Sequence, residues 1–210
     1  MKLCIIGSEG NFGSFLKSAL SEYNDIAGYS KETADTFILA VPLSEYKNAA
    51  QQIVNIHGNK IHFVNVCSVQ EDTTDLLLRM IDKNCGSLTS IHPLFGPRSS
   101  KSRSDRVSVV TYAHGKDSDY MIKLFSMISV IRGGVTPKQH DEFMAKTHYQ
   151  VVRIADQINK IVENAKDVPD YMLTPSFKKM KELANQFLDM PEGTRSSILA
   201  NKYGLEKLGD

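Results

Sequence analysis

Two polar side chains, His92 and Ser68, each follow an apolar run that is typical of a buried strand. An imidazole can accept the proton of an alcohol near neutral pH while a hydride leaves the adjoining carbon. In a doubly wound sheet the carboxyl ends of the strands face the ligand crevice, so both residues are expected there. The alternative for His92 is a plain turn histidine, since the following Pro93 restricts its backbone.

A glycine-rich turn that joins a strand to a helix is the second candidate site. The apolar run 3–6 leads into the segment Gly7-Ser8-Glu9-Gly10-Asn11-Phe12-Gly13. Backbone N–H groups and the helix dipole at such a turn favour a pyrophosphate. Gly10 would admit the phosphates and Gly13 would let the helix pack on the strand, although Ser8 stands where the first glycine of the usual spacing belongs. The alternative is a tight turn without a ligand.

The end of the second predicted strand bears on the choice of cofactor. A site for NAD usually places an acidic residue there for the ribose hydroxyls. Here Ser30 and Lys31 precede Glu32, and a serine with a lysine suits a 2′-phosphate better. We therefore expect NADP rather than NAD, with Lys31 as a solvated turn residue and Glu32 serving NAD as the alternative.

Strands and helices must position these groups, and their order predicts the fold. Short β-branched runs are expected to be strands at 3–6, 26–29, 36–41, 61–66, 88–91, 107–111 and 128–131. Helical periodicity marks 12–23, 46–56, 74–83 and 118–127, and after 133 it marks only helices, at 138–165, 176–188 and 192–208. The fold class is therefore α/β: a Rossmann-type, doubly wound, mostly parallel sheet in residues 1–133, followed by a small all-helical domain in residues 134–210.

Composition narrows the classes of function. The formal charge of +1 lacks the basic excess that nucleic-acid binding needs. The three cysteines match no zinc spacing and are expected to be reduced thiols, so no metal is predicted. No run approaches the length of a membrane span and the start resembles no signal peptide, which predicts a cytoplasmic protein without membrane partners.

Three segments together resemble the prephenate and arogenate dehydrogenases of tyrosine biosynthesis, whose patterns are close to H-P-M-F-G-P, D-x-x-S-V-K and H-D-x-x-M-A. The matching segments are His92–Pro97, 65–70 and 140–145, and the turn 10–13 and the pair Val41-Pro42 add to the likeness. The resemblance implies NAD(P)-dependent oxidative decarboxylation of prephenate or arogenate. It implies His92 as the base on the ring hydroxyl, Ser68 as its orienting partner, Val41 and Pro42 beside the cofactor, and a homodimer through the helical domain.

The chain departs from that family where charges are expected. Asn65 and Gln70 replace the acid and the lysine of the second pattern, and Lys178 stands where the family commonly uses an arginine for the substrate's carboxylate. Arg98, in a cationic loop that is otherwise typical of a solvated surface, is a further candidate for that anion. These departures keep open a nucleotide-sensing protein without catalysis, and a β-hydroxyacid-type dehydrogenase with Lys146 as its catalytic lysine.

The start of the second domain holds two more candidates. Asp141 is explained by a place at the start of the long predicted helix. His148 shares a predicted helical face with Met144 and Val151, which is typical of a packed core residue. Contact with the substrate is the alternative for His148, and we include it among the substrate-binding candidates.

Overall fold

The computed structural model describes residues 1–24, 26–27, 33–100, 102–188 and 190–204. The chain forms two compact units, Met1–Asp141 and Glu142–Asp210. The division falls inside α5 (Pro137–Lys146), eight residues beyond the domain boundary predicted after residue 133. The first turns of α5 thus belong to the sheet-containing unit, which becomes important for the site.

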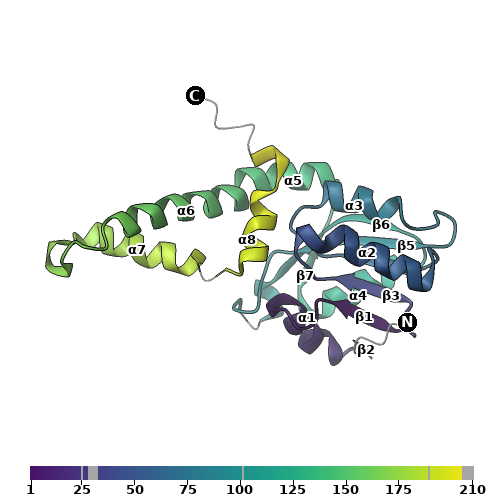
Figure 1. Cartoon of the computed structure of the whole chain (residues 1–210). Helices are drawn as coiled ribbons and strands as arrows, with labels where there is room; N and C mark the ends of the chain where they lie inside the picture. The colour runs from purple at the N-terminus through teal and green to yellow at the C-terminus, as the bar shows by residue number, and fades with distance from the viewer. Residues whose placement is uncertain (25, 28–32, 101, 189, 205–210) are drawn as a thin grey trace. The chain divides into compact units, whose positions relative to one another are not determined.

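A seven-stranded sheet in the order β2-β1-β3-β4-β5-β6-β7 is the frame of the first unit (Figure 1). All neighbouring strands are parallel except β5 and β6, which confirms the doubly wound, mostly parallel class. The predicted strand 26–29 runs beyond the described residues after Ala27. The strands are β1 (Leu3–Ile6), β2 (Ile26–Ala27), β3 (Thr36–Leu39), β4 (His62–Asn65), β5 (Ser87–Pro93), β6 (Val107–His114) and β7 (Val130–Arg132).

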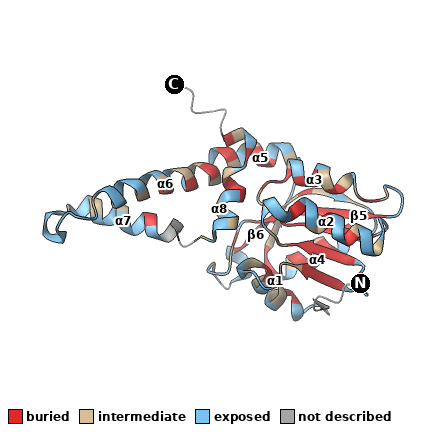
Figure 2. Cartoon of the chain, in the orientation of Figure 1, coloured by how far each residue is buried: buried red, intermediate tan, exposed pale blue. Residues whose placement is uncertain are grey.

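Helices cover both faces of this sheet because successive strand residues point to opposite sides. Phe37 and Leu39 of β3 pack in the core beneath α2 (Leu43–His57) and α3 (Glu71–Leu78). Ile38, between them, joins the other core, beneath α1 (Asn11–Ser21) and α4 (Ser118–Ile128). The central strands β1, β3, β4 and β5 are therefore buried almost throughout, as Figure 2 shows, whereas β6 and β7 are only partly buried.

The order of the strands fixes where a ligand is expected. From β1 the chain crosses through α1 to β2 on one side of it, whereas β3 lies on the other side. The carboxyl ends of β1 and β3 thus flank the topological switch point of the sheet. Gly7 follows β1 and Val41 follows β3, so the glycine turn lies at that point.

The third helix differs from its prediction at both ends. It was expected at 74–83, but α3 spans Glu71–Leu78. Just beyond its end, the carbonyl of Leu77 accepts the N–H groups of Met80 and Ile81 in a turn. Its early start has a long-range cause, because the N–H of Glu71 donates to Asp141 of α5.

The second unit is helical, as predicted, but its elements differ from the predicted ranges. The single helix expected at 138–165 is two helices, because Thr147 lies outside helical backbone angles, with φ −122° and ψ −81°. The helix expected at 192–208 ends at Leu199, and Gly204 then packs so closely on the ring of Tyr149 that an added Cβ would lie 2.4 Å from it. The helices are the end of α5, α6 (His148–Asn164), α7 (Pro175–Leu188) and α8 (Glu192–Leu199), with short 3-10 turns at Asp170–Met172 and Lys202–Gly204.

Within this unit α6 and α7 lie side by side (Figure 1). A small core unites α6 and α8 through Tyr149, Val152 and Ile198. Among the described residues, no helix is both long and apolar enough to cross a membrane.

Candidate active site at the carboxyl edge of the sheet

The glycine turn has the geometry of a phosphate-binding turn. Gly7 has a φ of +87°, which disfavours any side chain, and a Cβ there would lie 2.4 Å from the carbonyl oxygen of Ala40. At Gly13 a Cβ would lie 2.0 Å from the carbonyl oxygen of Gly7, so only glycine lets α1 approach the turn this closely. Gly10 precedes α1 in an extended conformation and, having no side chain, leaves the first N–H groups of the helix without a side-chain cap. The first amides of α1 are thus presented by a bare turn, which fits a dinucleotide pyrophosphate.

The other residues predicted to bind a cofactor surround this turn. Ser8 and Asn11 are in it, and Phe12 opens the first turn of α1 with its ring 6.1 Å from that of Phe15. Val41 contacts the turn, since a Cβ on Gly7 would lie 3.1 Å from its Cγ1, and Pro42 precedes α2. Ser30 and Lys31 lie outside the described residues, so the predicted preference for NADP stays a prediction.

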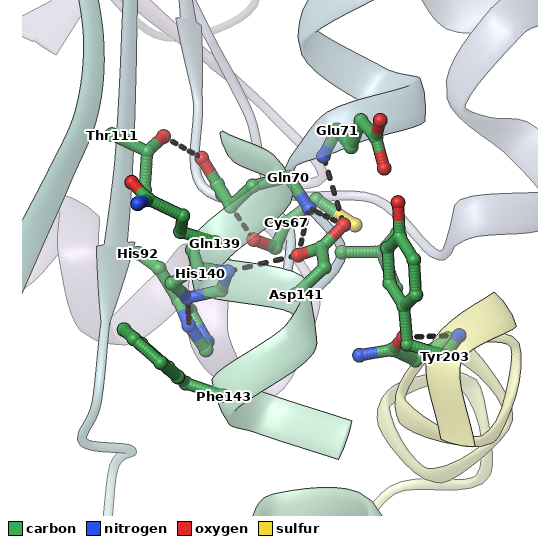
Figure 3. A network of polar contacts seen from close by, with 12 residues as sticks. Cys67, Gln70, Glu71, His92, Thr111, Gln139, His140, Asp141, Phe143 and Tyr203 are labelled. Atoms are coloured by element: carbon green, nitrogen blue, oxygen red, sulfur yellow. Dashed lines mark hydrogen bonds and ion pairs between the residues drawn. The ribbon is translucent and has the colours of Figure 1, made fainter. Parts of the chain in front are cut away.

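His92 lies at the carboxyl end of β5, on the same edge of the sheet as the glycine turn, and is 5% exposed. Its Nδ1 lies 2.9 Å from Nε2 of His140, and the two rings meet edge to face with centroids 4.9 Å apart. Figure 3 shows the pair, with His140 contributed by α5. The histidine that the sequence placed at the site is thus held by a second histidine 48 residues away.

Asp141 extends this contact into a chain of three groups. Its Oδ1 lies 2.8 Å from Nδ1 of His140 and accepts the N–H of Gln70 at 2.8 Å. Its Oδ2 accepts the N–H of Glu71 at 2.9 Å. We expected Asp141 to start its own helix. Instead it lies in the second turn of α5 and caps α3, which explains why α3 begins at Glu71.

The side chain of Gln70 holds the loop that receives Asp141. Its Nε2 donates to the carbonyl of Cys67 at 2.5 Å, and its Oε1 accepts from the hydroxyl of Thr111 at 2.7 Å (Figure 3). Gln70 is fully buried, so these two bonds fix its backbone N–H in place. Cys67 is no candidate nucleophile, because burial raises the pKa of its thiol to about 12.

Asn65 occupies a second buried polar network just below this loop. Its Oδ1 accepts from the hydroxyl of Tyr46 at 2.6 Å and from the N–H of Cys67 at 3.0 Å. Its Nδ2 donates to the hydroxyl oxygens of Thr73, at 2.9 Å, and Ser90, at 3.3 Å. Burial raises the pKa of Tyr46 well above its ordinary value, so its hydroxyl remains a donor. The amide thus ties α2, α3 and β5 to the end of β4.

The remaining predicted residues lie outside these networks, and their roles stay predictions. Ser68 is half-buried in the loop after β4. Arg98 is exposed in the loop after β5. Lys178, in the second unit, is exposed in the first turn of α7 and lies 3.8 Å from Asp170. His148 begins α6, and the break at Thr147 separates it from the helix of Met144, so that part of the predicted face was wrong, whereas Val151 follows His148 on α6.

Two other cations of the loop 98–106 have structural partners. The guanidinium of Arg106 lies over the rings of Phe15 and Phe95, at 5.0 and 5.6 Å from their centroids. Arg103 donates to the carbonyl of Ser126. The described residues contain no cluster of three or more histidine, cysteine or acidic side chains suited to a metal ion.

Sequence reasoning missed His140 as a site residue, although it named the segment that contains it. The adjacent pair His140-Asp141 was the available signal. Local spacing does not show that this pair meets His92 and Gln70, because those contacts join residues 48 and 71 positions apart.

Comparison with protein-family models finds no match, and neither does comparison with curated proteins. Among solved structures the chain is similar to prephenate dehydrogenase from Aquifex aeolicus, solved in complex with hydroxyphenyl propionate and NAD+ (TM-score 0.68, 16% identity, 97% of this chain and 84% of that one). It is also similar to Synechocystis arogenate dehydrogenase (0.62, 14%, 96% and 86%). A pyrroline carboxylate reductase from Plasmodium falciparum with NADP bound is a further neighbour (0.51, 12%, 90% and 76%). These likenesses establish a fold shared with the prephenate and arogenate dehydrogenases.

Proposed function

We propose that the chain is an NAD(P)-dependent dehydrogenase that oxidatively decarboxylates prephenate or arogenate. The observation that carries the proposal is the buried chain His92–His140–Asp141 at the carboxyl edge of the sheet that also bears the glycine turn. The fold shared with enzymes of both substrates supports the same activity. When bound, the cofactor supplies the hydride acceptor.

The residues of this chain supply the remaining functions in the proposal. The turn Gly7–Gly13 binds the pyrophosphate, and Val41 and Pro42 border the cofactor. His92 accepts the proton of the ring hydroxyl, with Ser68 as its orienting partner. Arg98, Lys178 and His148 are the proposed contacts of the substrate's anionic groups. Ser30 and Lys31 favour NADP as the cofactor.

A catalytic lysine, as in β-hydroxyacid-type enzymes, has less support. Lys146 is exposed at the end of α5, with its ammonium 5.9 Å from the centroid of the Phe143 ring. The polar network that the structure builds is centred on histidine instead.

The deciding experiment measures formation of reduced nicotinamide by purified protein, with prephenate and arogenate each combined with NAD and NADP. Turnover in one combination establishes the activity and both specificities. Cofactor binding by calorimetry without turnover in any combination contradicts the proposal and favours a nucleotide sensor.

A further inference from the structure

The three-group chain determines where its protons are. The carboxylate oxygens of Asp141 accept the backbone N–H groups of Gln70 and Glu71, and a backbone N–H is an obligatory donor. Nδ1 of His140 lies 2.8 Å from the same carboxylate and therefore carries a proton. In the neutral ring Nε2 of His140 is then an acceptor, so His92 must donate to it from Nδ1 across 2.9 Å. The lone pair of His92 is left on Nε2.

We propose that His140 and Asp141 are positioning residues that form a proton relay with His92, setting its tautomer and sharing the charge that it acquires. The catalytic part of this inference rests on the proposed function. The tautomer assignment rests on the hydrogen bonds alone. Asp141, at the far end of the relay, is held by backbone N–H donors, and the two side-chain hydrogen bonds of Gln70 fix the position of these donors.

In each turnover His92 takes up the proton of the ring hydroxyl and later returns it to the same oxygen. When the ring carbinol is oxidised, with a bound nicotinamide as the hydride acceptor, the hydroxyl would give its proton to Nε2 of His92 and the C–O bond would become a carbonyl. The proton on Nδ1 of His92 shifts to Nε2 of His140, and positive charge rests beside Asp141. When the ring carboxylate leaves as carbon dioxide, its bonding electrons pass through the ring to the oxygen, the relay reverses, and His92 returns the proton to form the phenol. No net proton is released.

Burial is compatible with this cycle because the relay needs no exit to solvent. His140 and Asp141 are 2% and 1% exposed. In such surroundings a transient imidazolium needs a fixed counter-charge, and Asp141 is that group. A base that had to release a proton at each turnover would require a hydrated path instead.

The test is Asp141→Asn, which keeps the shape of the side chain. The amide oxygen of the new side chain is expected to accept the hydrogen bonds from the N–H groups of Gln70 and Glu71. Its NH₂ group then faces Nδ1 of His140. Both histidines should then reverse from the Nδ1–H to the Nε2–H tautomer. Nitrogen-15 NMR of histidine-labelled protein measures this without substrate or cofactor. Asp117→Asn, which changes a carboxylate that accepts from Ser87 in the same unit, is the matched control and should leave both tautomers unchanged.

Turnover provides the second readout. We expect Asp141→Asn to lower kcat by a factor of about 100 or more, with cofactor affinity retained. His140→Gln places an amide oxygen near the position of Nε2, so it should preserve the tautomer of His92 but lower kcat by a factor of about 10 or more, since the charge is no longer shared.

Two results would overturn the relay: an Nε2–H tautomer of His92 in the natural protein, or full turnover in His140→Gln. If Asp141→Asn does not fold, as judged by its thermal transition, His140→Gln and the spectrum of the natural protein still decide. Absence of turnover in the natural protein contradicts the proposed function, whereas the spectra judge the tautomers separately.

Discussion

At the scale of single residues, Asn65 and Gln70 show how the chain replaces two charged positions of the resembled family. One change removes a negative charge and the other a positive charge, so the sum is unchanged. Both amides are fully buried and hydrogen-bonded at both ends. Neutral groups avoid the cost of desolvating two ions. Both amide side chains bond groups other than His92, His140 and Asp141.

His92 is the residue whose removal most directly tests catalysis. We expect His92→Asn to lower kcat by a factor of about 100 or more, because a general base contributes on that scale. Cofactor affinity should be nearly unchanged, since the glycine turn follows β1 rather than β5. Steady-state kinetics with a cofactor titration measure both quantities.

The matched control is His57→Asn, at a half-buried histidine at the end of α2, and it should leave turnover unaltered. Unchanged turnover in His92→Asn would remove this residue from the mechanism.

At the scale of elements, the sequence predicted the seven strands and the sheet helices with shifts of a few residues at their ends. Apolar periodicity locates elements because apolar residues mark the buried positions, and helices bury both faces of this sheet. The break between α5 and α6 was not predicted. Neither glycine nor proline marks it, and the hydroxyl of Thr147 bonds the carbonyl of Phe143 instead. The capping of α3 by Asp141 was also hidden, since it depends on tertiary contact rather than on local pattern.

The close approach of α1 to its turn makes Gly13 a sensitive position. Gly13→Ala would place a Cβ 2.0 Å from the carbonyl oxygen of Gly7, and backbone must move to relieve it. We expect a loss of about 1–3 kcal/mol in the free energy of unfolding and weaker cofactor binding. Urea unfolding and cofactor titration measure the two effects.

Gly96→Ala is the control, because an added Cβ there meets no atom within 4 Å. Equal stability of the two variants would mean that α1 is not packed on the turn this tightly.

One face of α6 bears an apolar stripe with a helical spacing of three and four residues. Val151, Ile154 and Ile161 are exposed, Ile154 and Ile161 by 52% and 50%, and Ile158 between them is half-buried. An uncharged stripe of this kind is typical of a protein interface. A second copy presents the same stripe without like-charge repulsion, so we propose a homodimer through α6.

Ile154→Glu with Ile161→Glu should convert this dimer to a monomer, since pairing would bury four carboxylates. Light scattering after size-exclusion chromatography measures the mass. Lys160→Gln, which is exposed on a different face of α6, should leave the mass unchanged. A natural protein that is monomeric at micromolar concentration would contradict the proposal.

At the scale of the whole molecule, His62 links stability to pH. It lies in β4 and is 1% exposed, and its Nε2 lies 2.9 Å from the hydroxyl oxygen of Thr89. Its Nδ1 has no hydrogen-bond partner among the described residues. Burial lowers the pKa of His62 from 6.5 to about 4, despite the opposing charges of Asp117 and Asp35.

The folded chain therefore keeps His62 neutral while the unfolded chain protonates it below pH 6.5. Stability from this group is complete above pH 6.5 and is lost as the pH falls toward 4, by up to about 3 kcal/mol. Urea unfolding at pH 7 and pH 4.5 should show this loss in the natural protein. His62→Gln should show a smaller loss, and an equal loss would assign the effect to other groups.

The division of the chain inside α5 restricts how this protein can exchange parts with its structural relatives. A junction at the predicted boundary, residue 133, would take the second histidine of the site and the cap of α3 from the incoming protein. A junction after Lys146 would keep both with the sheet that they serve. A crossover before α5 therefore makes the partner of His92 and the cap of α3 depend on the incoming protein, so the segment that builds the candidate site is longer than residues 1–133.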